Sequence, residues 1–203
     1  MLPFLLSVVV ISLSGVMMPG PMFAVTVAKS YKSQFAGMQI ALGHAIVEIP
    51  LILLIYFGLA RFFQEELTQI ILYLVGAAAL FWMGITMFKA RAKMIETSQG
   101  LAYNSVIAGV VTSAFNPFFL LWWVTIGSML IMKSLSFGML GFALFVPVHW
   151  LCDLVWFSLV SILVYRTQSF WGRKLQERLL IACSLLIIGF GGWFLTSGLQ
   201  LVL

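Results

Sequence analysis

Two pairs of ionisable residues lie within otherwise apolar stretches and have the same spacing. His44 and Glu48 occur in GHAIVE, and His149 and Asp153 occur in VHWLCD. A separation of four residues places both side chains of a pair on one face of a helix. An imidazole beside a carboxylate can exchange protons near neutral pH, or bind a cation or an ammonium group. These residues therefore indicate proton coupling, substrate binding or metal binding.

The stretches that carry the pairs are typical of a membrane protein. The 203 residues are 63% hydrophobic and 8% charged, whereas soluble proteins have roughly 25% charged residues. Six apolar runs each exceed the about 20 residues that cross a bilayer, and none shows the polar alternation of barrel strands. The runs are Leu2–Ala28, Phe35–Ala60, Leu67–Phe88, Leu101–Met132, Leu135–Tyr165 and Leu179–Leu203. The sequence predicts an all-α integral membrane protein, with residues 1–203 as a single transmembrane transporter domain of six helices.

The basic residues between the runs predict an orientation. Nine of the eleven Lys and Arg residues lie in the loops after the first, third and fifth runs: Lys29, Lys32, Lys89, Arg91, Lys93, Arg166, Arg173, Lys174 and Arg178. Only Arg61 and Lys133 lie in the other loops. By the positive-inside rule, we expect the basic loops in the cytoplasm and both termini outside an inner cell membrane. No basic run is interleaved with aromatics, so no nucleic-acid partner is expected.

Prolines interrupt two of the runs. The first contains Pro19-Gly20-Pro21, and the fourth contains Asn116-Pro117 near its middle. Proline removes a backbone donor and frees carbonyls of the preceding turn, which hydrocarbon cannot satisfy. Such breaks are tolerated only against protein or a wet cavity. We expect both segments to be helices broken within the membrane, with Asn116 offering its amide to a ligand or to freed backbone groups.

The two halves of the chain resemble each other. In each half a broken helix is followed by a helix that carries a histidine and a carboxylate. Three helices per half give the halves opposite orientations, so we expect an inverted repeat, residues 1–95 and 96–203. Paired interrupted helices in corresponding positions indicate a transporter binding site. Glycines 37, 43, 76, 84, 189, 191 and 192 predict close helix packing, and the glycine content is compatible with a homodimer.

Several alternatives follow from the same residues. A carboxylate at mid-bilayer costs about 2.5–3.5 kcal/mol on insertion scales, which favours a function for Glu48 and Asp153 over a purely structural role. Two histidines and two carboxylates also suit a divalent metal, so a metal transporter is the alternative function. A scaffold or redox protein is a third class, although Cys152 and Cys183 have no CxxC spacing. Catalytic motifs are absent, and neither an enzyme activity nor a cofactor is expected.

The chain resembles the LysE/RhtB family of amino-acid exporters. The resemblance rests on Pro19-Gly20-Pro21, on Gly37 and Gly43, on Asn116-Pro117, and on Asp153-Leu154-Val155-Trp156. It implies a six-helix inner-membrane protein that exports amino acids or related small metabolites, driven by protons. One departure is that His44 and Glu48 stand where many relatives carry small or apolar residues.

These observations predict a secondary exporter that works by alternating access. We expect Pro19, Gly20, Pro21, Asn116 and Pro117 to form substrate-binding breaks, where helix N-termini meet a carboxylate. Glu48 or Asp153 would bind the substrate ammonium or exchange a proton. His44 and His149 would relay protons with them, and no resident metal is expected.

Overall fold

The described residues form helices joined by turns, and no strand occurs among them. This computed structural model describes residues 1–18, 20–58, 65–97 and 104–202, with side chains for all except residues 90, 92–97, 117 and 121. The helices are α1 (Leu2–Val16), α2 (Pro21–Ser30), α3 (Ala36–Tyr56), α4 (Glu66–Thr97), α5 (Ser105–Ala114), α6 (Pro117–Trp122), a π-helical turn (Trp123–Gly127), α7 (Ser128–Leu135), α8 (Gly138–Thr167) and α9 (Arg173–Gln200), with a 3-10 turn at Gln168–Phe170.

Both predicted helix breaks are confirmed. The first apolar run divides into α1 and α2, whose axes differ by 76°. The fourth divides at Asn116 into α5 and α6. A proline stands in the first turn of both α2 and α6, where its missing N–H costs no helical hydrogen bond. Pro19 lies outside the described residues, so the break is defined by Gly20, which caps α2 in an extended conformation, and by Pro21.

Asn116 satisfies part of the second break itself. Its side-chain Oδ1 accepts a hydrogen bond from Phe118 N at 3.1 Å and so caps α6. The side-chain amide of Asn116 was expected to bind either a ligand or backbone groups left free by the break, and the structure shows the second of these, a bond to the backbone N–H of Phe118. The Nδ2 amide hydrogens remain the only part of the side chain that can donate to a ligand.

We expect Asn116→Ala to destabilise the folded protein by about 1 kcal/mol, because an N-cap oxygen is lost. Asn116→Ser should restore most of this loss, since serine is also a good N-cap. Thermal unfolding in detergent would measure both variants. Asn104 caps α5 in the same way but is exposed, so water can replace it and Asn104→Ala is the matched control. Equal losses at the two positions would contradict a particular importance of the cap at the break.

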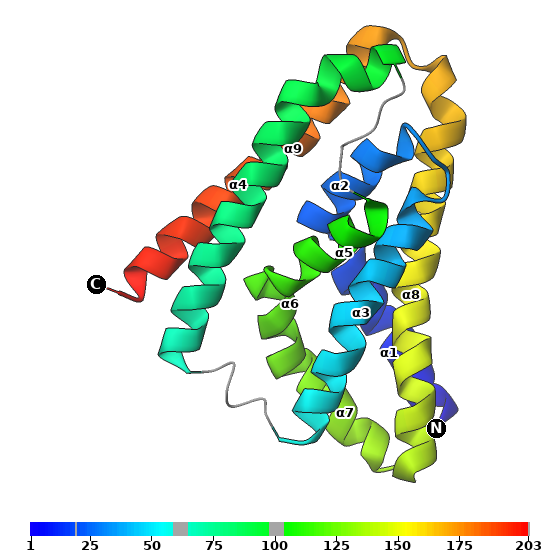
Figure 1. The fold of residues 1–203 in the computed structure, drawn as a ribbon. Helices are drawn as coiled ribbons and strands as arrows, with labels where there is room; N and C mark the ends of the chain where they lie inside the picture. The colour runs from blue at the N-terminus through cyan, green and yellow to red at the C-terminus, as the bar shows by residue number, and fades with distance from the viewer. Residues whose placement is uncertain (19, 59–64, 98–103, 203) are drawn as a thin grey trace.

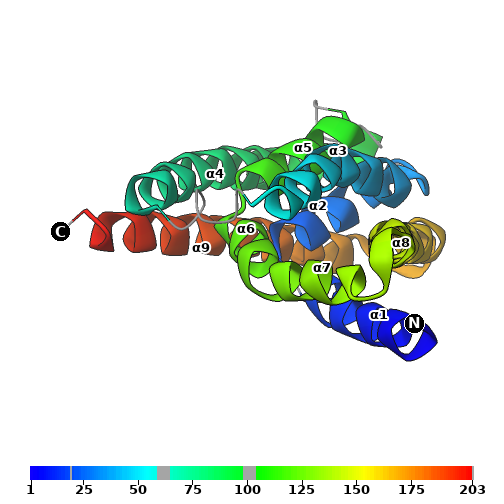
Figure 2. The ribbon, with the colours of Figure 1, turned by 90° about the horizontal axis from the view of Figure 1, so that it is seen from below.

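The centre of the molecule is built from helices of both halves of the chain. α3 and α8 run antiparallel, α5 packs against α3, and α1 packs against α8 (Figure 1). α4 and α9 form a second antiparallel pair, inclined to the first and in contact with it through α2 (Figures 1 and 2). The pairs α3–α8 and α4–α9 thus each join a helix of the first half to an antiparallel helix of the second half.

Some helix ends differ from the apolar runs. α4 extends to Thr97, beyond the predicted end at Phe88, and α9 begins at Arg173 rather than Leu179. The added residues include charged ones that do not enter hydrocarbon, but their helix propensity is good, so the helix continues outside the apolar part. Hydropathy therefore locates the apolar part of a helix but not the residue at which its backbone hydrogen bonding begins or ends.

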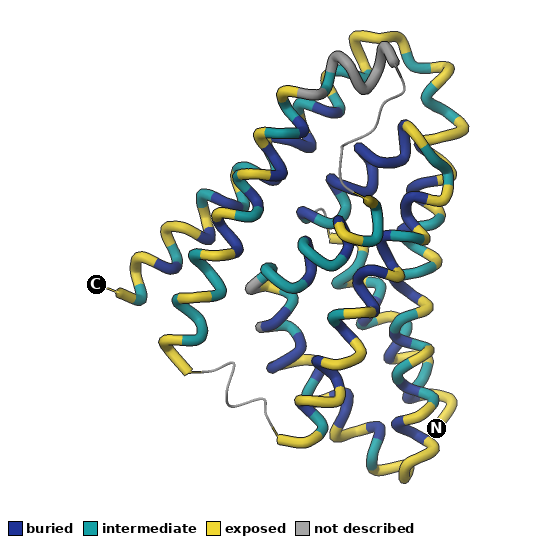
Figure 3. The backbone as a smooth tube through the Cα atoms, in the orientation of Figure 1, coloured by how far each residue is buried: buried dark blue, intermediate teal, exposed yellow. Residues whose placement is uncertain are grey.

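The outward faces of the helices are apolar. Yellow exposed segments run along the outer sides of α3, α4, α8 and α9 in Figure 3. Exposed side chains there include Leu54, Trp82, Leu163 and Leu185. A soluble protein rarely exposes such continuous apolar surface, whereas lipid is a suitable solvent for it. Five helical segments are long and apolar enough to span a membrane, or six if α1 and α2 form one bent span.

Glycines bring α3 close to its neighbours. A Cβ atom on Gly43 would overlap Val106 O of α5, and one on Gly109 would overlap Ile40 O of α3. Gly37 meets the backbone of Phe157 in α8 in the same way. The prediction of close packing is wrong for Gly189 and Gly192, where a Cβ would meet no described atom within 4 Å.

Candidate functional site

The two ionisable pairs meet at the centre of the fold. Helices α3 and α8 each place a histidine and a carboxylate near their midpoints, on the faces that they turn toward each other. The exposed fractions are 4% for His44, 1% for Glu48, 3% for His149 and 2% for Asp153. Such residues are rarely buried unless they are paired, so their mutual contacts determine what the site can do.

Glu48 lies at the middle of this cluster, which comprises His44, Glu48, His149 and Asp153. Its Oε1 atom is 3.0 Å from His44 Nε2 and 3.1 Å from His149 Nε2. The indole of Trp123 donates to the same oxygen at 3.3 Å. One carboxylate oxygen thus joins the histidines of both halves: the expected pairing of His44 with Glu48 is present, whereas His149 bonds to Glu48 rather than to Asp153.

Asp153 occupies a looser position in the cluster. Its Oδ1 lies 3.8 Å from His44 Nε2, and its Oδ2 lies 4.0 Å from His149 Nε2. These separations allow electrostatic attraction but exceed hydrogen-bond length. Asp153 Oδ2 and Glu48 Oε2 are buried without a hydrogen-bond partner among the described residues. The cluster therefore has spare acceptor capacity for a proton or a cation.

Two serines orient the imidazole rings. Ser113 Oγ on α5 is 2.7 Å from His44 Nδ1, and Ser12 Oγ on α1 is 2.7 Å from His149 Nδ1. Each serine belongs to the broken helix of the half opposite to its histidine. Sequence reasoning missed both serines, because their only signal was a hydroxyl within an apolar run. The cluster is consequently connected to both broken helices.

Aromatic side chains from the segment after the second break cover the imidazoles. Phe119 meets His44 edge-on at 4.9 Å, and Trp122 stacks on His149 at 5.4 Å. Trp123 also meets His149 edge-on at 4.9 Å. The sequence gave no sign that Trp123 would donate to Glu48. These rings exclude water from the cluster in this conformation.

The residues at the two breaks come close to each other beside the cluster. Ser113 Oγ, three residues before Asn116, lies 3.8 Å from Met22 Sδ in the first turn of α2. A Cβ on Gly15, near the end of α1, would lie 3.4 Å from the Trp122 indole nitrogen. α2 has no side-chain cap, so its first N–H groups are available at the first break.

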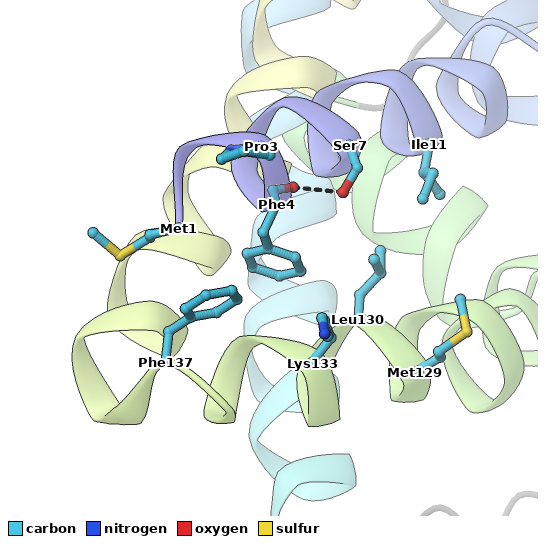
Figure 4. A pocket seen from close by; sticks show the side chains of 9 residues that line it. All are labelled: Met1, Pro3, Phe4, Ser7, Ile11, Met129, Leu130, Lys133 and Phe137. Carbon is cyan, nitrogen blue, oxygen red and sulfur yellow. Dashed lines mark hydrogen bonds between the residues drawn. The ribbon is translucent and has the colours of Figure 1, made fainter.

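A separate cavity of about 500 Å³ lies between α1 and α7. Its lining is largely apolar and includes Phe4, Ile11, Leu130 and Phe137, with Lys133 among them (Figure 4). None of the four cluster residues lines it. Cys152 and Cys183 are free and buried, and Cys152 adjoins the cluster through Asp153 and Ser12.

The fold and the cluster together define a multi-pass α-helical membrane protein with a buried ionisable centre. Residues 13–198, most of the chain, match the LysE type translocator family, and the chain belongs to that family. The protein is thus a membrane translocator, and the family resemblance expected from the proline motifs is confirmed. No curated protein and no solved structure matches the chain at a significant level.

Proposed function

We propose that this protein exports amino acids or related small metabolites across the inner cell membrane, driven by protons that bind at the cluster. The observation that carries the proposal is the position of Glu48 Oε1 between the two imidazoles. Family membership supports a small-molecule substrate of this kind. It favours an amino-acid-like substrate over a divalent metal as the transported species.

The hydrogen bonds of Ser113 support a proton at the centre of the cluster. Its hydroxyl lies 2.7 Å from both Gly109 O and His44 Nδ1; with its single proton donated to Gly109 O, it accepts from His44 Nδ1, and we assign this tautomer. His44 Nε2 then faces Glu48 Oε1 at 3.0 Å. Two lone pairs at that distance repel, so a proton stands between them, on the imidazole or on the carboxyl.

Loss of that proton would act on α8 through Glu48, because the same Oε1 atom also meets His149 Nε2. With His44 Nε2 and Glu48 Oε1 both unprotonated, their contact within α3 becomes repulsive in a water-excluded environment, and a shift of Glu48 would weaken its bond to His149 of α8. The two serines would transmit this change to α1 and α5, because each holds one of the rings. Proton release and rearrangement of the broken helices would then be coupled, as alternating access requires.

The breaks would bind the substrate. The uncapped N–H groups that follow Gly20 and Pro21 suit a carboxylate, since a helix N-terminus carries partial positive charge. Asn116 Nδ2 at the start of α6, next to Pro117, would donate a further hydrogen bond. Asp153, the less engaged carboxylate, is suited to the ammonium group. Pro19 is assigned with these residues on its sequence position alone.

Counterflow in proteoliposomes would test the proposal. The vesicles would be loaded with a mixed amino-acid pool and assayed with and without an imposed pH gradient. We expect saturable exchange that the gradient accelerates, and protein-free vesicles should show none. Absence of exchange by demonstrably folded protein would contradict the proposed function.

Accessibility labelling of single cysteines at the two termini would test the expected placement of both termini outside the membrane. Cross-linking in the membrane would test whether the protein forms a homodimer.

A further inference from the structure

The ligand atoms of the cluster are arranged as in a metal site. His44, Glu48 and Asp153 each offer one ligand atom, and all three atoms lie within 4.8 Å of one another. His44 Nε2 is 3.0 Å from Glu48 Oε1 and 3.8 Å from Asp153 Oδ1. Ligands of a tetrahedral Zn²⁺ ion, each about 2.0–2.1 Å from the metal, lie about 3.3–3.4 Å apart. The two distances from His44 Nε2 are within about half an ångström of this value, and the two carboxylate oxygens are at most 4.8 Å apart, so side-chain shifts of up to about 1.5 Å would place the three atoms around one ion.

His149 is the candidate for a fourth ligand. Its Nε2 lies 3.1 Å from Glu48 Oε1 and 4.0 Å from Asp153 Oδ2, so it is near both carboxylates, although it lies outside the group of three whose ligand atoms are all within 4.8 Å of one another. Two nitrogen and two oxygen ligands form a tetrahedral set of the kind that Zn²⁺ and Co²⁺ accept. Mg²⁺ and Ca²⁺ are disfavoured, because they take six or more oxygen ligands.

The surroundings of the histidines also resemble those of metal ligands. A ligating histidine usually donates its other ring N–H to an acceptor, which fixes the tautomer. His44 Nδ1 meets Ser113 Oγ, whose own proton is engaged by Gly109 O, so the Nε2 lone pair is directed at the carboxylates. The partnerless oxygens Glu48 Oε2 and Asp153 Oδ2 would gain a cation as their missing partner.

We propose that the cluster binds one Zn²⁺ or Co²⁺ ion through His44, Glu48, Asp153 and His149, as an inhibitor rather than as transported substrate. The ion would tie α3 to α8 where Glu48 and His149 otherwise meet. Because it bridges two helices that must separate, it would hold the transporter in one conformation. The inhibitory consequence rests on the proposed export function, whereas the binding site itself does not.

Co²⁺ binding to the purified, tag-free protein would test the site. The chain contains only two histidines, both in the cluster, so no surface histidine contributes background. Visible absorption distinguishes tetrahedral Co²⁺ from the octahedral aqueous ion, and a thiolate ligand would add a near-ultraviolet charge-transfer band. Titration after overnight equilibration allows the ion to reach the buried cluster, and Mg²⁺ serves as the negative control.

We expect one tetrahedral Co²⁺ per chain, displaced by Zn²⁺, with no thiolate band. His44→Gln and His149→Gln should each weaken binding by more than the about 10–100-fold that loss of an outer-shell partner costs. Ser113→Ala should weaken it by about tenfold through the orientation of His44. Lys133→Gln, outside the cluster, should bind as the wild type does. Size-exclusion chromatography would confirm that each variant is folded.

Three outcomes would overturn the proposal: no Co²⁺ binding by folded wild-type protein, unchanged binding by both histidine variants, or saturable Zn²⁺ flux through the protein. The first two concern the site and the third its inhibitory role. Export without metal binding would contradict the metal site and leave the proposed export function intact. Metal binding without any export would support the metal site and contradict the proposed export function.

Discussion

We expect Glu48→Gln to lower gradient-driven export by on the order of 100-fold, the scale on which positioned proton-transfer groups act. Glutamine keeps a carbonyl oxygen that accepts from the imidazoles and from Trp123, so the packing of α3 against α8 is largely preserved. It cannot take up or release a proton. The initial rate of efflux from proteoliposomes, with and without a pH gradient, measures the effect.

Two comparisons make this result specific. Glu66 stands exposed at the start of α4, so Glu66→Gln is a matched control that should export at the wild-type rate. Asp153→Asn should also abolish net export. If Glu48→Gln retains exchange but ignores the gradient, the carboxylate couples protons; if it loses both, the carboxylate binds substrate. Wild-type gradient-driven export by this variant would rule out the coupling role.

Gly109→Ala should destabilise the protein by about 1–3 kcal/mol, as overpacking of a close contact does. The added methyl group would overlap Ile40 O and lie 3.0 Å from His44 N, and these are backbone atoms that cannot rotate away. α5 and α3 must therefore move apart. Thermal unfolding in detergent would report the loss as a lower midpoint.

Gly192→Ala in α9 is the matched control, because a Cβ there meets no described atom within 4 Å. Alanine has the better helix propensity, so this variant should be as stable as the wild type or more stable by up to about 1 kcal/mol. Gly109→Ala should in addition reduce export, since separation of α5 from α3 lengthens the contact of Ser113 with His44. A midpoint at or above that of the control would contradict the close helix contact.

Much of the architecture could be predicted from the sequence, because local patterns determine it. Apolar runs revealed the helices, and Pro19–Pro21 and Asn116–Pro117 revealed the breaks. The equal spacing of His44–Glu48 and His149–Asp153 indicated two faces of similar chemistry. Each of these signals lies within a few residues of the feature that it predicts.

The geometry of the cluster could not be predicted in the same way. Which carboxylate lies at the centre depends on how α3 and α8 are rotated about their axes, and packing contacts far apart in sequence set that rotation. Ser12 and Ser113 gave no local signal, since a serine in an apolar helix often bonds only to its own backbone. Gly109 was missed because its importance depends on the position of α3. The inverted repeat, the orientation and the proton coupling remain predictions.

The three hydrogen-bond partners of one Glu48 oxygen also bear on how this chain can change over generations. Substitution of Glu48 alone would leave two imidazoles and the Trp123 indole N–H buried without this hydrogen-bond partner. Substitution of either histidine would remove one hydrogen-bond partner from the carboxylate. Each such intermediate carries an unpaired buried polar group, which costs about 1–3 kcal/mol. Drift by single steps is therefore penalised, and we expect homologous chains to keep residues 44, 48, 123 and 149 as a set or to replace them as a set.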